Sequence, residues 1–542
     1  MLLNIETFQG LIPRRAAKKL GISQAQIADD CNLLNGDLRA WMQNKFVWTP
    51  TKVGTINSLY NYEQAYWFHW TEPNISVVRA PIAGDTSGRT IYTGVATGPK
   101  ITDNTIAVQG GGTNYPNNAY DLGIPAPAIA PTVAGTANVD PALNETRIYV
   151  ETYVSAWGEE GAPSPVSAMI DIDPNLAVNI TSSNTVPVGN YNIISKRIYR
   201  SVDSGTSASF MLVAEIPVAQ TTYSDTLSGV VVASNGGLIS ADWDMPPANL
   251  TGIIELPNGS IAGFAGNELC ISVPYQPHAW PIAYRYAVNW PIVGIGAYGN
   301  SIAIGTTGMP YIAVVGDPSM VSVEKIETEQ ACVSMRGIVD MGYAIAMPTP
   351  DGLQVIGTGV NKLITEQLMT RAEWQALNPS SIHAYLHDGR YIAFYDATSI
   401  GGIQGGFIID PKEPEAGLTH TSIYATAGFA NRLDDHLYLV VGGNVVQWNG
   451  NTIARTYTWR SKIFHAPKPT NPTVAQVKAS AYPLTFNFYA DGALIHTQSV
   501  ANGNPFRLPA GYLAEDFEIE IAGSTDVSQC IIAESMSELR QV

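Results

Sequence analysis

Apolar and polar residues alternate along most of this chain in short runs, which is the pattern of half-buried β-strands. After residue 250 these runs pair around turns at residues 266, 299, 342, 389 and 435. A four-stranded unit that repeats at roughly 40–50 residues is typical of a β-propeller. A strand–turn–strand meander from Ser58 to Thr93 adds one more such unit. The pattern therefore predicts an all-β protein whose propeller has about six blades.

A second alternating region, from Thr146 to Gly229, resembles a separate small domain. Its runs Arg147–Val154, Lys196–Arg200 and Phe210–Ala214 alternate, and loops with Gly and Pro separate them. Regular short strands over about 90 residues predict an immunoglobulin-like or fibronectin type III-like sandwich inserted into the propeller. The Pro- and Ala-rich stretch Pro116–Pro131 precedes it as an extended linker.

The beginning of the chain has a different texture. Ser23 is a residue type that caps helices, so we expect a short helix from Ser23 towards Leu38, with a hairpin turn at Asn35-Gly36. A basic group precedes this segment: Arg14, Arg15, Lys18 and Lys19. We interpret the group as part of a docking arm for an acidic partner; the alternative is a solvated helix face.

These observations predict five parts. They are an N-terminal docking arm with a short helix (1–50), a first propeller blade (51–115), a linker with the inserted fibronectin III-like sandwich (116–245), the remaining blades (246–455) and a C-terminal β domain that closes the ring (456–542).

Composition narrows the possible functions. The 542 residues include 29 Lys and Arg against 46 Asp and Glu, a net charge of −17. This balance argues against broad electrostatic attachment to DNA or to an anionic membrane. The four cysteines, Cys31, Cys270, Cys332 and Cys530, form no C-x-x-C pair, so we predict buried free thiols. The first fifteen residues do not have the pattern of a signal peptide, and we expect synthesis in the cytosol without stable membrane insertion.

Candidate chemistry is sparse. There is no G-x-S-x-G, no P-loop and no G-x-G-x-x-G that opens a helix. Asp242 and Asp244 could form a carboxylate pair for glycoside hydrolysis, and Ser201–Ser207 partly matches the Asp-box turn of sialidases. A solvated linker for the first and a hairpin turn in the sandwich for the second are the favoured interpretations. We expect no catalytic residue, no cofactor and no metal site, and therefore no enzyme.

Three stretches, in this order, resemble one known family. The first is Ile12–Arg15 with the Ala28–Trp41 segment. The second is Thr152–Pro165, which contains Trp157, Gly158, Glu159 and Glu160, together with Lys196–Arg200. The third is Trp459-Arg460-Ser461-Lys462 with Tyr489–Gly492, which contains Asp491 and Gly492, and with Pro505–Pro509. Together they resemble the tail nozzle, or tail tubular protein B, family of short-tailed, podovirus-like bacteriophages.

The resemblance implies a structural role in the virion tail. It implies a homo-oligomer, a hexameric ring below the head-to-tail adaptor, that extends the DNA ejection channel and supports tail fibres or spikes. Such a chain is assembled in the host cytoplasm. Double-stranded DNA would pass through without sequence-specific binding, which agrees with the acidic charge because a negative lumen repels phosphates.

Acidic loop residues are candidates for the channel wall: Asp351, Asp388, Asp434 and Asp435. The alternative is a plain turn role. Two other functions stay open at this point. One is a host-surface propeller that binds or cleaves carbohydrate, and the other is a propeller scaffold unrelated to phage.

Overall fold

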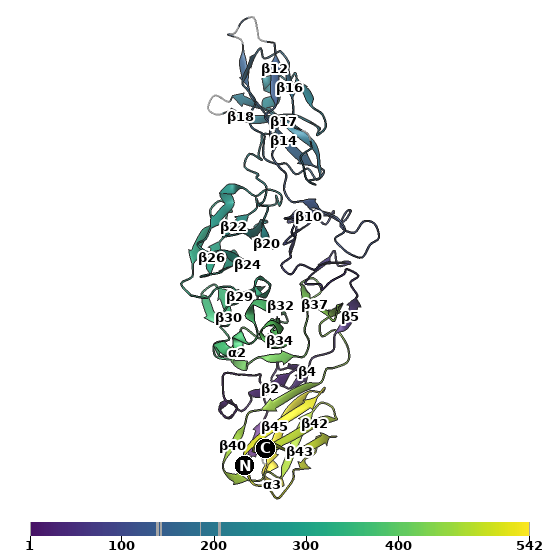
Figure 1. Cartoon of the computed structure of the whole chain (residues 1–542), viewed down its shortest axis with the longest axis vertical. Coiled ribbons are helices and arrows are strands. Elements are labelled where there is room, and N and C mark those ends of the chain that lie inside the picture. Colours follow the sequence, from purple (N-terminus) through teal and green to yellow (C-terminus); the bar gives the residue numbers. More distant parts are fainter. Residues whose placement is uncertain are drawn as a thin grey trace. The chain divides into compact units, whose positions relative to one another are not determined.

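The computed structural model describes residues 2–136, 140, 142, 144–184, 186–203 and 208–540 (Figure 1). Its contacts divide the chain into two compact units. The first unit comprises Met1–Pro73, Gly296–Ile312 and Lys325–Val542, and the second comprises Asn74–Ile295 and Ala313–Glu324. The fold is all-β, as the alternating pattern predicted: a β-propeller with an inserted sandwich and a C-terminal β domain.

The first unit contains three antiparallel groups of four strands that have the blade pattern. They are β28 (Val339–Asp340), β29 (Ala344–Pro348), β30 (Leu353–Gly357) and β31 (Val360–Leu363); β32 (His383–His387), β33 (Arg390–Asp396), β34 (Gln404–Ile409) and β35 (Thr419–Thr421); and β36 (Ala427–Asn431), β37 (His436–Val441), β38 (Asn444–Gln447) and β5 (Lys45–Trp48). The first strands of neighbouring groups pack together, β28 against β32, β32 against β36, and β36 against β6 (Ser58–Tyr62). Contact between successive first strands is expected where blades meet at a propeller axis.

The second unit contains two further four-stranded antiparallel sheets. They are β8 (Ser76–Arg79), β9 (Thr90–Thr93), β10 (Lys100–Thr102) and β11 (Tyr120–Asp121), and β20 (Thr251–Glu255), β21 (Ile261–Ala265), β22 (Glu268–Ile271) and β23 (Arg285–Ala287). Their first strands, β8 and β20, again pack on each other around a core that includes Trp280. Another four-stranded sheet consists of β24 (Ile292–Tyr298), β25 (Ser301–Thr306), β26 (Tyr311–Val314) and β27 (Ser322–Lys325).

The predicted sandwich lies within the second unit. One sheet has the order β12 (Thr132–Gly135), β16 (Val178–Thr181), β19 (Thr222–Asp225), and the other β14 (Tyr149–Ser155), β17 (Ile193–Asp203), β18 (Ala208–Pro217). A short ladder of β13 (Glu145–Arg147) with β15 (Ile170–Ile172) and a short helix, α1 (Gly229–Ala233), complete it. Tyr149, Ile180 and Ile198 are buried between the sheets, so their alternation reflects an interior face.

The C-terminal β domain has two sheets. They are formed from β39 (Tyr457–Ser461), β40 (Phe464–Thr470), β41 (Val474–Ala479), β42 (Leu484–Ala490), β43 (Ala493–Val500), β44 (Phe506–Arg507), β45 (Ala514–Gly523) and β46 (Val527–Ala533), followed by α3 (Met536–Leu539). Both sheets also take strands from the beginning of the chain: β1 (Leu2–Ile5) pairs with β46, and β2 (Ala25–Asp29) pairs with β39. Because β2 also pairs with β35, one continuous sheet joins this domain to a blade.

Two expectations about the beginning of the chain are wrong. The predicted helix from Ser23 is the strand β2, because pairing with β39 satisfies its backbone and buries Ala25 and Ala28. Among the described residues of this segment, the helical structure is one 3-10 turn, Ala17–Lys19. Residues 1–50 are also not a separate arm, since β1, β2 and β5 are built into other sheets. The hairpin at Asn35-Gly36 is confirmed: β3 (Cys31–Asn32) pairs with β4 (Arg39–Ala40).

The first predicted blade also differs. β6 and β7 (Tyr66–Trp70) form a two-stranded sheet, and β8 begins a different sheet, so the Ser58–Thr93 meander is two structures rather than one. The sequence analysis did not predict the short helices α1, α3 and α2 (Arg371–Gln375). Thr370 and Glu373 form a capping box at the start of α2. Among the described residues, no helix is both long enough and apolar enough to cross a membrane.

Candidate functional sites

The motif Trp157–Glu160 follows directly after β14 and joins the sandwich to the propeller sheet of β8–β11. The Glu159 carboxylate lies 3.1 Å from the Arg89 guanidinium, on the opposite side of this junction. Arg89 also lies 3.4 Å from Asp85, whose second oxygen accepts the Arg89 backbone N–H at 2.8 Å. The ion pairs therefore hold the loop that precedes β9 against the end of β14.

Glu160 faces the sandwich instead. It accepts hydrogen bonds from the Thr152 hydroxyl at 2.5 Å and the Tyr199 hydroxyl at 2.7 Å, and Arg197 lies 2.7 Å away. Glu160 is 5% exposed. Glu159 thus contacts the propeller sheet and Glu160 contacts the sandwich, because neighbouring residues in an extended segment point in opposite directions.

Trp157 strengthens the same junction. Its indole N–H donates to Asp103 at 3.2 Å, its ring meets Tyr120 edge-on at 5.4 Å, and the Arg89 guanidinium lies over it at 5.7 Å. Gly158 has a φ of 79°, a left-handed conformation that favours glycine and allows the turn from Trp157 into Glu159.

Burial changes the acid–base properties of this junction. It raises the pKa of Glu159 to about 7, although Arg89 acts in the opposite direction. Burial also lowers the pKa of His278 to about 4, and its Nε2 lies 3.0 Å from the main-chain oxygen of Glu160. His278 Nδ1 is 4.0 Å from Glu159. The junction therefore favours a neutral histidine at neutral pH, beside a carboxyl group that titrates there.

The C-terminal motif residues also make contacts inside the chain. Trp459 is fully buried in β39, donates its indole N–H to Gln9 at 3.0 Å and packs edge-on against Phe8. Arg460 lies 2.8 Å from Glu518, with its guanidinium 3.9 Å from the centre of the Tyr489 ring.

Asp491 and Gly492 form the turn between β42 and β43. Both have positive φ, 47° and 79°. One Asp491 carboxylate oxygen accepts the backbone N–H groups of Glu515 and Asp516. This turn role is the one expected of an Asp-Gly pair in a hairpin.

The four basic residues proposed for docking lie around the 3-10 turn and are exposed. Lys18 lies 2.6 Å from Asp516, and Arg14 donates to the main-chain oxygen of Glu366. Arg15 has a weak contact with Gln24 at 3.5 Å. Two of the four thus tie this segment to its own chain, and binding of an acidic partner stays a prediction.

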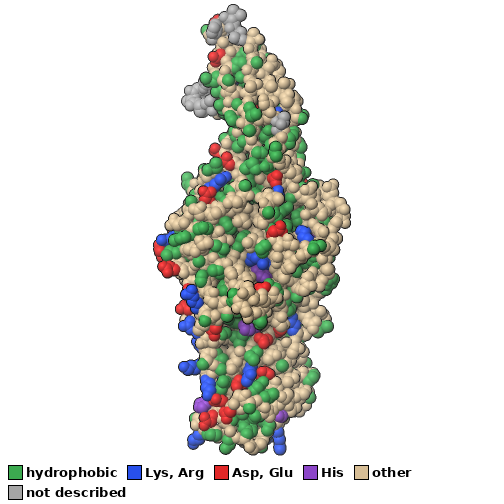
Figure 2. Space-filling view, in the orientation of Figure 1, with side chains coloured by type: hydrophobic (Ala, Val, Ile, Leu, Met, Phe, Trp, Pro, Cys, Tyr) green, Lys and Arg blue, Asp and Glu red, His purple; other side chains and the backbone are tan. Residues whose placement is uncertain are grey.

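The acidic loop residues occupy turns. Asp388 and Asp435 have positive φ at hairpin tips, 51° and 56°. Asp434 accepts bonds from the His436 backbone and the Tyr438 hydroxyl, and Asp351 lies 3.1 Å from Arg371. Figure 2 shows acidic and basic side chains mixed in small groups on the face drawn. A channel role for these carboxylates stays a prediction.

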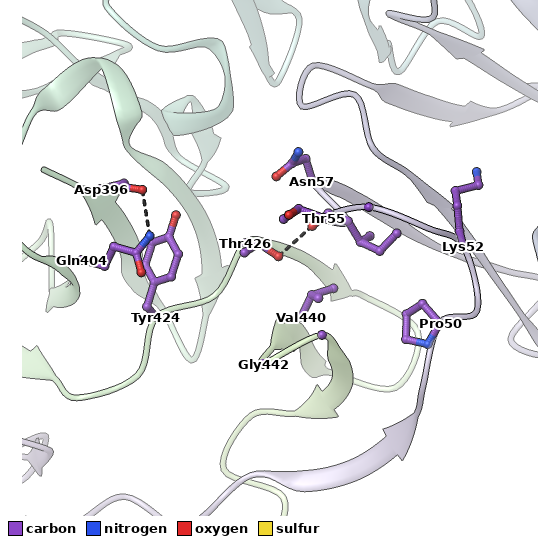
Figure 3. A pocket seen from close by; sticks show the side chains of 13 residues that line it. Pro50, Lys52, Thr55, Asn57, Asp396, Gln404, Tyr424, Thr426, Val440 and Gly442 are labelled. Atoms are coloured by element: carbon purple, nitrogen blue, oxygen red, sulfur yellow. Dashed lines mark hydrogen bonds between the residues drawn. The ribbon is translucent and has the colours of Figure 1, made fainter. Parts of the chain in front are cut away.

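A cavity of about 1070 Å³ lies in the first unit (Figure 3). Its walls include Pro50, Lys52, Gly54, Thr55, Ile56, Asn57, Asp396, Gln404, Tyr424, Thr426, Val440, Gly442 and Gly443. Gln404 donates to Asp396 at 2.8 Å, and Thr426 donates to the Ile56 main chain at 2.7 Å. Asp396 is the one carboxylate among these lining residues, whereas canonical glycoside hydrolysis uses two. Asp242 and Asp244 belong to the second unit and lie outside its strands.

Other chemistry is limited within the described part of the chain. No group of three or more His, Cys, Asp and Glu residues there could hold a metal ion. All four cysteines are buried and free, which confirms the prediction, and burial raises the pKa of Cys332 and Cys530 to about 12. The possible Asp-box, Ser201–Ser207, lies largely outside the described residues.

Sequence reasoning missed the partners of the junction motif. Arg89, Asp85 and His278 are far from Trp157–Glu160 along the chain and carry no local motif. The sequence could have indicated that such partners exist, because two adjacent carboxylates after a buried strand require nearby cations or hydroxyl donors.

Comparison with known proteins identifies no family. No family model and no curated protein matches the chain. Solved structures overlap it weakly. An extracellular domain from B. thetaiotaomicron is 11% identical, with a TM-score of 0.23, and the overlap covers 87% of this chain and 48% of that chain. BBS1N in complex with ARL6DN is 10% identical (TM-score 0.28, 74% of this chain and 96% of that chain), and YCF48 from Cyanidioschyzon merolae is 11% identical (TM-score 0.22, 74% of this chain and 98% of that chain). The chain thus spans about half of the first of these. Overlaps this slight identify neither a family nor a function.

Proposed function

We propose that this chain is a structural subunit of a short-tailed phage tail, in which six copies form a nozzle ring below the head-to-tail adaptor. The ring would extend the channel through which DNA is ejected and would support fibres or spikes. The proposal begins from the resemblance of three ordered stretches to tail nozzle proteins.

One structural observation carries it further. The charged side chains of the resembling motifs that we single out, Glu159, Glu160, Arg460 and Asp491, all bond to other parts of the same chain. These contacts hold the sandwich against a propeller sheet, join neighbouring strands, or fix a hairpin turn. Catalytic carboxylates must reach a substrate, so this use favours a scaffold over an enzyme.

The charge balance supports the same role. A ring of subunits that each carry a net charge of −17 would not adsorb the phosphate backbone of passing DNA. The low share of charged residues, 14%, also suits a chain with much of its surface against neighbouring subunits.

The decisive experiment locates the chain in virions. An epitope tag is inserted in the exposed β43–β44 loop, at residues 501–504, and intact tagged virions are imaged with gold-labelled antibody. We expect gold at the distal tail below the head, with six-fold symmetry after averaging of unlabelled tails. Untagged virions are the control. If a tag that binds antibody on the purified chain is absent from virions, or marks only fibres, the nozzle proposal is wrong.

A further inference from the structure

The interior of the sandwich contains a buried lysine, a buried glutamate and a carboxamide in one hydrogen-bonded group. Glu151 on β14 and Lys196 on β17 belong to one sheet, while Ser182 and Asn184 follow β16 of the other. Glu151 and Lys196 are fully buried, and Ser182 and Asn184 are 3% and 5% exposed. Ordinary sandwich cores are apolar at such positions, so this group needs a reason.

The hydrogen bonds form an unbroken path from the amine to the carboxamide. Lys196 Nζ donates to Ser182 Oγ at 2.8 Å and to the main-chain oxygen of Asn184 at 2.8 Å. Ser182 Oγ donates to Glu151 Oε2 at 2.7 Å, and Asn184 Nδ2 donates to the same oxygen at 3.0 Å. A nucleophile, a proton carrier and a leaving group are therefore already connected.

The orientation of the carboxamide is fixed by a third segment. Asn184 Nδ2 donates to the Ile129 main-chain oxygen at 2.6 Å, and the Ile129 N–H donates to Oδ1 at 3.1 Å. These two bonds assign the nitrogen and the oxygen of the side chain. The amide nitrogen thus faces Glu151, which is where a departing ammonia would need a proton.

The charges of this group are incompletely compensated. Burial lowers the pKa of Lys196, so its ammonium group loses a proton more easily to give the nucleophilic amine. Glu151 Oε1 is buried and has no hydrogen-bond partner among the described atoms. A buried ion pair elsewhere in the sandwich is satisfied: Arg200 lies 2.8 Å from Asp225, which also accepts the Tyr149 hydroxyl.

We propose that Lys196 and Asn184 form an intramolecular isopeptide bond, with Glu151 as the proton carrier. Lys196 Nζ swings from the main-chain oxygen of Asn184 to its Cγ, an Nζ–Cγ bond forms, and the Cγ–Nδ2 bond breaks. Two of the three ammonium protons leave Nζ by way of Glu151 and end on Nδ2, which departs as ammonium. Glu151 returns to the carboxylate, and no oxidant or cofactor takes part.

The product would link the two sheets of the sandwich covalently. Its amide N–H could donate to Glu151, which removes the unpartnered oxygen, and a buried ammonium would be replaced by a neutral amide. Such a bond resists mechanical separation of the sheets. The inference concerns the chemistry of the sandwich alone, so its outcome is independent of the tail proposal.

The test is the mass of the purified full-length chain. We expect the intact protein to be lighter than its sequence by one ammonia. There is no Lys or Arg between Arg147 and Lys196, so trypsin releases Ile148–Lys196 from an unmodified chain. The bond blocks cleavage after Lys196, and we expect Ile148–Arg197, lighter by one ammonia and without fragment ions between the joined residues.

Two results would overturn the proposal. One is a wild-type protein with its full sequence mass. The other is loss of ammonia with normal cleavage after Lys196, which would indicate a succinimide at Asn184 instead. Lys100→Met, which changes an ion-paired lysine elsewhere in the second unit, is the matched control and must retain the ammonia loss.

Variants test the role of Glu151. Glu151→Gln retains the amine and the carboxamide but removes the proton carrier, so we expect the full mass, with no ammonia lost. If Glu151→Gln is insoluble, Ser182→Ala interrupts the same path with a smaller change, and we expect a mixture of bonded and unbonded chains. Complete bond formation in either soluble variant would contradict the assigned proton path.

Discussion

The junction between the sandwich and the propeller sheet predicts a concealed pH dependence. Folding raises the pKa of Glu159 from its ordinary value of 4.5 to about 7, and lowers that of His278 from 6.5 to about 4, in both cases chiefly by burial. At about 1.4 kcal/mol for each pKa unit, each change corresponds to roughly 3 kcal/mol. The two contributions have opposite signs.

The folded state binds a proton more tightly than the unfolded state at Glu159. This contribution to stability is fully present below pH 4.5 and is lost as the pH rises through 7. His278 behaves in reverse, because its contribution is present above pH 6.5 and is lost as the pH falls through 4. Between pH 4.5 and 6.5 the two slopes nearly cancel in the wild type.

Single substitutions at Glu159 or His278 should therefore expose the pH dependence of the remaining group, which cancels in the wild type. We expect Glu159→Gln to lose about 3 kcal/mol of stability as the pH falls from 6.5 to 4, and His278→Gln to lose about 3 kcal/mol as it rises from 4.5 to 7. The double variant should lack both of these contributions to the pH dependence. The assay is urea unfolding at a series of pH values, followed by hydrogen exchange of peptides from the second unit. If Glu159→Gln has the pH profile of the wild type, the assignment is wrong.

Three further changes test other contacts. Arg460→Ala removes both the ion pair and the stacking on Tyr489, and should lower the free energy of unfolding by about 2 kcal/mol, whereas Arg460→Lys should recover part of it. Gly94 has a φ of 98°, and a Cβ added there would meet a main-chain oxygen, so Gly94→Ala should lower the free energy of unfolding in urea by about 2 kcal/mol or more. Gly84→Ala is the control: its Cβ would lie in open space, and it should lower the free energy of unfolding by about 1 kcal/mol. Lys19→Glu should leave the melting temperature unchanged but weaken association with an acidic partner ring, measured by co-sedimentation; unchanged association would contradict the docking interpretation.

Local patterns determined which segments are strands. In β42, Leu484, Phe486 and Phe488 are buried while the residues between them are half-exposed, so the alternation of the sequence is also the alternation of the structure. The Asn35-Gly36 and Asp491-Gly492 turns could also be predicted from the sequence, because few residue types fit a turn position with positive φ. These features depend on neighbours in the chain.

Pairing between distant segments depended on tertiary structure. The segment from Ala25 to Asp29 has residues that suit a helix, yet it is a strand because β39 and β35 supply partners that are hundreds of residues away. The junction is a similar case: the sequence singled out Glu159 and Glu160, but only the fold brings Arg89 and His278 to them. Packing over the whole domain determines which strands pair and which group lies beside a buried charge, so a local sequence pattern does not predict either one.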